Sequence, residues 1–282
     1  MDYQVKTLAA GFAFPEGPRW HNGKLWFSDQ HDSKVYALEP DGRVAETFDV
    51  PGRPSGMGWL PNGDLIVVSM QGRQVYRRQG GELRPYADLS ALHSFHSNDM
   101  VVDRSGRAYV GNIGFDFEHG GAPASTVMAM VAPDGAVSVA ATDLMVPNGT
   151  VISADGRTLI VAESMASRLT TFDIGADGAL ANRRVFATLG DNVPDGICLD
   201  GEGCVWIASC FAGVALRVRE GGQILDRVPI PNANPFACML GGADGRTLFI
   251  CCAPHHEPAK TVIARGGRID VAQVAVGRAG WP

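Results

Sequence analysis

A short motif recurs six times along this chain. Each copy joins a small turn sequence, a short apolar stretch, a hairpin turn and a second apolar run. The copies are PEGPRWHNGKLWFSD from residue 15, PSGMGWLPNGDLIVVS from 54, SNDMVVDRSGRAYVGN from 97, PNGTVISADGRTLIVAE from 147, PDGICLDGEGCVWIAS from 194 and, more weakly, PFACMLGGADGRTLFICC from 235. Their starts lie 39 to 50 residues apart, which matches the roughly 40 to 50 residues of one propeller blade.

The segments between and within the repeats have strand and hairpin character. Asn22-Gly23, Asn62-Gly63 and Asp155-Gly156 are tight-turn dipeptides, and runs such as LIVV and TLIVA are short and β-branched. No stretch sustains a 3.6-residue apolar period, so few helices are expected. The repeats therefore predict an all-β fold, a six-bladed β-propeller with four-stranded antiparallel blades around a central channel, as a single domain over residues 1–282. DYQVKTLAAG and RIDVAQVAV, near the two ends, both read as strands, and one is expected to close the ring.

One position of the motif is polar in most repeats. The second residue of each copy reads Glu16, Ser55, Asn98, Asn148, Asp195 and Phe236. Equivalent residues of successive blades are related by rotation about the central axis, so we expect these side chains to converge at one mouth of the channel. An alternative is that each Asn or Asp only makes backbone hydrogen bonds in its own turn.

Convergent carboxylates repel one another and lose hydration, which a bound cation relieves. Glu16 and Asp195 supply two negative charges, and Asn148 and Asn98 supply amide oxygens. An all-oxygen set suits a hard divalent ion. We expect one divalent cation in the channel, Ca²⁺ as the first choice, with Mg²⁺, Mn²⁺ or Zn²⁺ as alternatives. Because the protein supplies only a few ligands, coordination positions stay open for water or substrate. Open positions are typical of a catalytic metal ion rather than a purely structural one.

Composition excludes several other classes of protein. The formal net charge is -6 and the pI about 5.6, without a basic block, so neither nucleic acid nor an anionic membrane is expected as a partner. No apolar run approaches the roughly 18 residues of a membrane span, and the N-terminus lacks the pattern of a secretory signal. A cytoplasmic protein, monomeric or weakly self-associating, is expected. The six cysteines lie mostly in apolar runs and are expected to be buried, reduced thiols.

Four ordered motifs resemble the senescence marker protein/gluconolactonase/luciferin-regenerating enzyme family, which includes regucalcin-like proteins, over nearly the whole chain. They are FPEGPRW with Glu16, SNDMVVDRSGRAYVGN with Asn98, VPNGTVISADGRTLIVAES with Asn148 and VPDGICLDGEGCVWIAS with Asp195. The resemblance implies a six-bladed propeller that binds one divalent metal and opens lactones such as aldonolactones. It also implies Glu16, Asn148 and Asp195 as metal ligands, Asp195 as the catalytic acid/base, and Asn98 as a substrate contact.

The chain departs from the sugar-lactonase pattern at one position. That pattern has Arg-x-Asn-Asp, and this chain has His96 in place of the arginine. Arginine offers several donors in a fixed fork and histidine at most two, which favours a less hydroxylated lactone or an ester. The family often has an acidic substrate contact in the region of the loop 114–123, and the resemblance implies Asp116 as the candidate. Phe115 and Phe117 form either an apolar wall or lid, or loop anchors.

These residues predict a divalent-metal-dependent lactonase. The cation polarises the carbonyl, and Asp195 takes a proton from water and returns it to the leaving alkoxide. A metal-bound carboxylate is a weak base, so either its second oxygen is free for water or a metal-bound hydroxide attacks. His96 is either a second proton carrier or an orienting hydrogen-bond partner. The alternatives are an aryl-ester or phosphotriester hydrolase at the same site, or a non-catalytic metal-binding propeller.

Other polar residues are expected to be structural. Asp99, Asp103 and Asp200 are expected to brace turns, and His255-His256 to face solvent. Ser164 lacks the glycines of a nucleophile elbow, which argues against a serine hydrolase.

Overall fold

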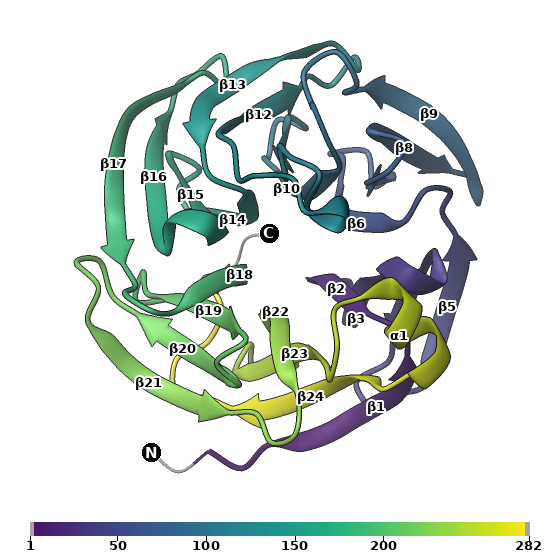
Figure 1. The fold of residues 1–282 in the computed structure, drawn as a ribbon, viewed down its shortest axis with the longest axis vertical. Coiled ribbons are helices and arrows are strands. Elements are labelled where there is room, and N and C mark those ends of the chain that lie inside the picture. The colour runs from purple at the N-terminus through teal and green to yellow at the C-terminus, as the bar shows by residue number, and fades with distance from the viewer. Residues whose placement is uncertain (1–2, 280–282) are drawn as a thin grey trace.

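The computed structural model describes residues 3–279, whose strands form six four-stranded sheets arranged as blades around a central axis (Figure 1). Each of the first three blades runs from an inner to an outer strand. Blade 1 consists of β2 (Pro15–His21), β3 (Lys24–Asp29), β4 (Lys34–Leu38) and β5 (Val44–Asp49). Blade 2 consists of β6 (Pro54–Trp59), β7 (Leu65–Ser69), β8 (Gln74–Gln79) and β9 (Glu82–Asp88). Blade 3 consists of β10 (Ser97–Val102), β11 (Ala108–Asn112), β12 (Thr126–Val131) and β13 (Val137–Leu144).

The other three blades repeat this order, with one exception at the end of the chain. Blade 4 consists of β14 (Pro147–Ile152), β15 (Thr158–Glu163), β16 (Arg168–Ile174) and β17 (Leu180–Thr188). Blade 5 consists of β18 (Val193–Leu199), β19 (Val205–Cys210), β20 (Val214–Val218) and β21 (Ile224–Pro229). Blade 6 consists of β22 (Asn234–Gly241), β23 (Thr247–Ala253), β24 (Gly267–Gln273) and, as its outer strand, β1 (Lys6–Phe12). The predicted six-bladed architecture is confirmed.

Both ends of the chain meet in blade 6. Strand β1 pairs antiparallel with β24, with Lys6 opposite Val271 and Phe12 opposite Gly267. The Thr7 hydroxyl donates a hydrogen bond to Asp270 Oδ1 at 2.8 Å. This pairing confirms the expected closure, because it ties the first blade-forming segment to the last.

Helical structure is short and lies in the connections between strands. It consists of the 3₁₀ turns η1 (Gln30–Asp32), η2 (Phe117–His119) and η3 (Ser164–Ala166) and the helix α1 (Pro258–Ala264). Among residues 3–279, no helix is long and apolar enough to cross a membrane.

The inner strands approach one another so closely that their motif glycines are required. A Cβ on Gly149 would lie 2.4 Å from the Ile197 nitrogen, and one on Gly196 would lie 2.3 Å from the Ala237 Cβ. Neither distance is physically accessible, so only glycine fits between neighbouring blades here. This explains why glycine follows Asn148 and Asp195 in the motif, and it brings those two side chains to the axis.

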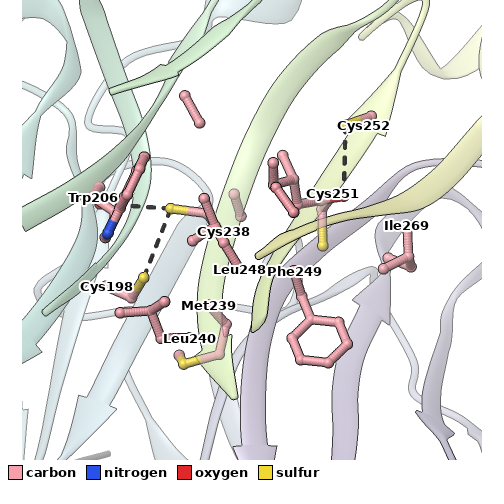
Figure 2. Close-up of a cluster of buried hydrophobic side chains, with 14 of the residues drawn as sticks. Cys198, Trp206, Cys238, Met239, Leu240, Leu248, Phe249, Cys251, Cys252 and Ile269 are labelled. Atoms are coloured by element: carbon pink, nitrogen blue, oxygen red, sulfur yellow. Dashed lines mark hydrogen bonds between the residues drawn. The ribbon is translucent and has the colours of Figure 1, made fainter. Parts of the chain in front are cut away.

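The largest apolar cluster lies around blade 6 and its neighbours. Figure 2 shows part of it, with Cys198, Cys238 and Trp206 packed between strands. The Cys238 Sγ lies 3.9 Å from the Cys198 Sγ and 3.5 Å from the Trp206 carbonyl oxygen. All six cysteines are buried and free, as expected from their apolar surroundings in the sequence.

Of the three aspartates expected to brace turns, two do so. Asp103 accepts from the Ser105 and Arg107 nitrogens, and Asp200 accepts from the Glu202 and Cys204 nitrogens. For Asp99 the expectation is wrong. Its carboxylate is buried and binds the buried guanidinium of Arg19 in blade 1 at 2.8 Å. This ion pair joins blade 1 to blade 3, so neither residue indicates its partner when the sequence is read alone.

Candidate functional site

A cavity of about 280 Å³ opens on the side of the ring where the inner strands begin. Figure 1 shows these strands, β2, β6, β10, β14, β18 and β22, around the centre. Five of the six equivalent motif residues border the cavity: Glu16, Asn98, Asn148, Asp195 and Phe236. The sixth, Ser55, lies outside its lining and accepts a hydrogen bond from Gln30 Nε2 at 3.4 Å. The convergence predicted from the repeats is therefore observed for the four acidic and amide residues.

The two carboxylates of this set share the enclosed space. Glu16 is 6% exposed, and the Gly17 nitrogen donates to its Oε2 at 2.6 Å. Burial and then the negative charge of Asp195 raise the pKa of Glu16 well above its usual value. Burial also raises the pKa of Asp195, although a hydrogen bond from Asn148 opposes this. Without a cation, the pair therefore resists carrying two negative charges.

Hydrogen bonds to neighbouring strands orient the two amide side chains. Asn148 Nδ2 donates to Ser164 Oγ at 3.2 Å, and Ser164 Oγ donates to the Pro194 carbonyl at 2.7 Å. Asn98 Nδ2 donates to the Pro147 carbonyl at 3.5 Å. With their NH₂ groups directed at protein acceptors, both amides keep their oxygen atoms for another partner. Ser164 is a positioning residue that sequence reasoning considered only as a nucleophile.

The donor set fits a hard divalent cation. Two carboxylates balance a 2+ charge, and amide oxygens complete an all-oxygen set. Arg19, which lowers the pKa of Glu16, is itself held by Asp99, so it leaves this pair incompletely neutralised. Within residues 3–279, His, Cys, Asp and Glu side chains form no group of three that could hold a metal. Any cation here would consequently need amide oxygens from Asn148 or Asn98.

The loop after β11 is placed differently from the expectation for Asp116. Asp116 lies outside the cavity lining, and its Oδ1 accepts from the His119 nitrogen at 3.1 Å to cap η2. Glu118, two residues later, borders the cavity and pairs with Arg53 at 2.5 Å. Phe115 and Phe117 both border the cavity, which supports the wall interpretation of the two that the sequence allowed.

His96 lies in the cavity wall, at the position expected from the motif. Its ring stacks on Phe95 with 4.1 Å between ring centroids. Burial lowers the pKa of His96 below its usual value, which favours the neutral imidazole at neutral pH. Its Nδ1 is buried without a hydrogen-bond partner in the described chain.

Much of the cavity wall is apolar, and sequence reasoning missed most of it. The apolar residues that border the cavity are Phe14, Met70, Ile113, Phe115, Phe117, Val146, Met165, Val193, Phe211, Phe236 and Pro258. His255 and His256 are both exposed, as expected, and the half-exposed side chain of His256 also borders the cavity.

A positional signal could have identified five of the cavity-lining residues, three of them apolar. In five blades, the residue directly after the second strand borders the cavity: Gln30, Met70, Ile113, Ser164 and Phe211. The second strand of each blade runs antiparallel to the inner strand, so it ends on the side where the inner strand begins. Aligning the residues that follow the second strands would therefore predict part of the cavity wall.

Comparison with known proteins identifies the family of this chain. The profile described as "SMP-30/Gluconolactonase/LRE-like region" matches residues 14–254. A 6-deoxy-6-sulfogluconolactonase of Pseudomonas putida is 28% identical over 84% of this chain and 81% of that protein. Among solved structures, a calcium-binding protein, regucalcin, from Agrobacterium tumefaciens is similar with a TM-score of 0.84 at 22% identity, covering 100% of this chain and 97% of that one. A gluconolactonase from Xanthomonas campestris is similar with a TM-score of 0.78 at 25% identity, covering 97% and 90%.

Proposed function

This chain belongs to the SMP-30/gluconolactonase/LRE-like family, and on that premise we propose that it hydrolyses a lactone with one divalent cation held by Glu16, Asn148 and Asp195. The observation that carries the proposal is the convergence in one cavity of two carboxylates, Glu16 buried and Asp195 partly buried, with two amides that are held by hydrogen bonds. The lactonase names of relatives from Pseudomonas putida and Haloferax volcanii support the reaction class. The all-oxygen donor set favours Ca²⁺, with Mg²⁺, Mn²⁺ or Zn²⁺ as alternatives.

A bound divalent cation would polarise the lactone carbonyl and stabilise the negative charge that develops on its oxygen. The chain's residues supply the rest. Asp195 accepts a proton from the attacking water as the new C–O bond forms at the carbonyl carbon. It returns that proton to the ring oxygen as the ring C–O bond breaks, so the product is a hydroxy acid. Burial raises the pKa of Asp195 in the cation-free chain, and a bound cation would lower it again. Asp195 would therefore exchange the proton through the carboxylate oxygen that is left free for water.

Asn98 and His96 are assigned to substrate binding. Asn98 borders the cavity beside the proposed cation ligands, with its amide oxygen directed away from its Pro147 contact. His96, neutral and stacked on Phe95, offers fewer donors than an arginine. This supports a less hydroxylated lactone than a sugar lactone as the substrate.

A substrate panel tests the reaction class. Wild type supplied with Ca²⁺ is assayed by proton release on δ-valerolactone, phenyl acetate and a dialkyl aryl phosphate. Asp195→Asn is measured beside Asp49→Asn, a control at a carboxylate that is 81% exposed on β5. We expect lactone turnover in wild type and in the control, and none in Asp195→Asn. Equal activity on phenyl acetate would contradict the lactone preference, and cation binding without turnover would favour a non-catalytic propeller.

A further inference from the structure

We propose that the lactone carries a neutral, apolar substituent of about phenyl size, which lies between two groups of aromatic side chains at the cavity mouth. This inference rests on the proposed lactonase function for the identity of the reacting ring. The aromatic residues of the cavity wall would bind the substituent, whereas the carboxylates Glu16 and Asp195 belong to the hydrolytic step.

The first aromatic group comes from blades 1, 5 and 6. Phe236 lies 4.6 Å from Phe14 and 6.3 Å from Phe211, measured between ring centroids. The second group comes from the segments that flank the first two strands of blade 3. Phe95 stacks on His96 at 4.1 Å and meets Phe117 edge-on at 5.9 Å. Blade 3 lies across the channel from blade 6 (Figure 1). His96 and Phe117 of the second group border the cavity, as do all three members of the first, so aromatic rings line it from both sides.

Three side chains at this mouth are unusually exposed for their apolar character. Phe117 is 43% exposed, Met165 50% and Phe211 60%, and all three border the cavity. Each comes from a different blade. Apolar surface of this kind, gathered around a cavity rather than scattered, marks a binding site for an apolar group.

Phe211 adds an independent observation. Its φ is 70°, in the left-handed region that bulky residues rarely adopt. Its side chain is mostly exposed, so burial in the core does not offset the conformational free energy of this backbone geometry. Backbone strain at an exposed aromatic residue points to contact with a ligand rather than to a role in stability.

Two polar groups of the wall, Arg53 and His31, already have partners within the protein. Arg53 pairs with Glu118 at 2.5 Å, and His31 Nδ1 lies 2.6 Å from Thr261 Oγ1. Burial lowers the pKa of His31 to about 4, so its ring is neutral. A polyhydroxylated or charged substituent would have to displace these contacts, whereas a neutral apolar group would not.

The test compares three δ-lactones with alkoxide leaving groups: δ-phenyl-δ-valerolactone, unsubstituted δ-valerolactone and glucono-δ-lactone. In wild type with Ca²⁺, we expect kcat/KM for the phenyl lactone to exceed that for glucono-δ-lactone at least tenfold. Phe211→Asn should lower kcat/KM for the phenyl lactone about three- to tenfold, mainly through KM, with a smaller loss on δ-valerolactone. Its thermal midpoint should stay equal or rise, because asparagine tolerates positive φ. Val185→Asn, at a residue 53% exposed on the outer strand β17, is the control and should leave all three substrates unaffected.

The outcomes separate this inference from the proposed function. Hydrolysis that favours glucono-δ-lactone, or an equal effect of Phe211→Asn on all three lactones, would overturn the apolar substituent and leave lactonase activity standing. Binding of the non-hydrolysable lactam 6-phenylpiperidin-2-one is measured in parallel by calorimetry. If no lactone is hydrolysed and this lactam binds wild type more tightly than Phe211→Asn, the apolar site is supported and the lactonase proposal fails. Absence of lactam binding would overturn the inference.

Discussion

Replacing Glu16 with glutamine should change how the stability of the metal-free protein depends on pH. Burial and the charge of Asp195 raise the pKa of Glu16 in the folded state above its unfolded value of about 4.3. The folded chain therefore retains a proton that the unfolded chain has released. The stability contributed by this proton is full below about pH 4.3 and is lost as pH rises through the folded pKa. The wild-type free energy of unfolding should consequently fall between pH 5 and 8.

The size of the effect follows from the number of protons involved. One retained proton contributes a slope of about 1.4 kcal/mol per pH unit over the interval in which Glu16 titrates. Glu16→Gln removes this slope, so within that interval it should gain stability relative to wild type as pH rises, by roughly 3 to 5 °C in the unfolding midpoint for each pH unit. Asp195 keeps its own dependence because its pKa is raised mainly by burial. The two proteins should have similar stability at pH 5.

Thermal unfolding followed by circular dichroism, at pH 5 to 8 with chelator or with excess Ca²⁺, measures both parts of this prediction. At about 100-fold excess over its dissociation constant, the cation should stabilise wild type by about 2.7 kcal/mol and Glu16→Gln much less. Glu82→Gln is the control, because the Glu82 side chain is 71% exposed on β9. If Glu16→Gln shows the wild-type pH dependence, Glu16 is not the group that retains the proton; if it keeps the full stabilisation by Ca²⁺, Glu16 is not a cation ligand.

Four further predictions concern other parts of the molecule. Asp195→Asn should lower kcat by about 10² to 10⁴ while the circular dichroism spectrum stays unchanged; a smaller loss would remove Asp195 as the acid/base. His96→Arg should shift the ratio of kcat/KM toward glucono-δ-lactone, since arginine adds donors to the wall; an unchanged ratio would mean that His96 does not contact substrate. Arg19→Met should cost about 3–5 kcal/mol in urea unfolding by leaving buried Asp99 unpaired, and adding Asp99→Asn should recover most of the loss. If the blades form one domain, as we propose, urea unfolding should show a single transition, and deletion of β1 should lower its midpoint by exposing the edge of β24.

The fold could be predicted because its information is local and repeated. Each repeat contains the apolar runs of its own strands and the turn dipeptide between them, and the spacing of the repeats matches the length of one propeller blade. The same regularity predicted that Glu16, Asn98, Asn148 and Asp195 would converge, because symmetry relates equivalent positions even when they are far apart in sequence.

The rest of the site depends on contacts that cross between blades. Arg19 and Asp99 are 80 positions apart and meet only across the ring, so neither residue reveals the other in the sequence. The loop containing Asp116 is irregular, and the chain's path through η2 brings Glu118 rather than Asp116 to the cavity. The aromatic wall is split among several loops, each of which looks unremarkable when read alone.

Lactone hydrolysis by chelator-stripped protein, followed by proton release with each divalent cation added back in turn, shows directly whether the channel carboxylates hold a catalytic cation. We expect no turnover in the stripped protein and recovery with Ca²⁺ or another hard dication in wild type, with no recovery in Glu16→Gln. Turnover that persists after chelation at the same rate, or full recovery in Glu16→Gln, would contradict a cation held by the channel carboxylates.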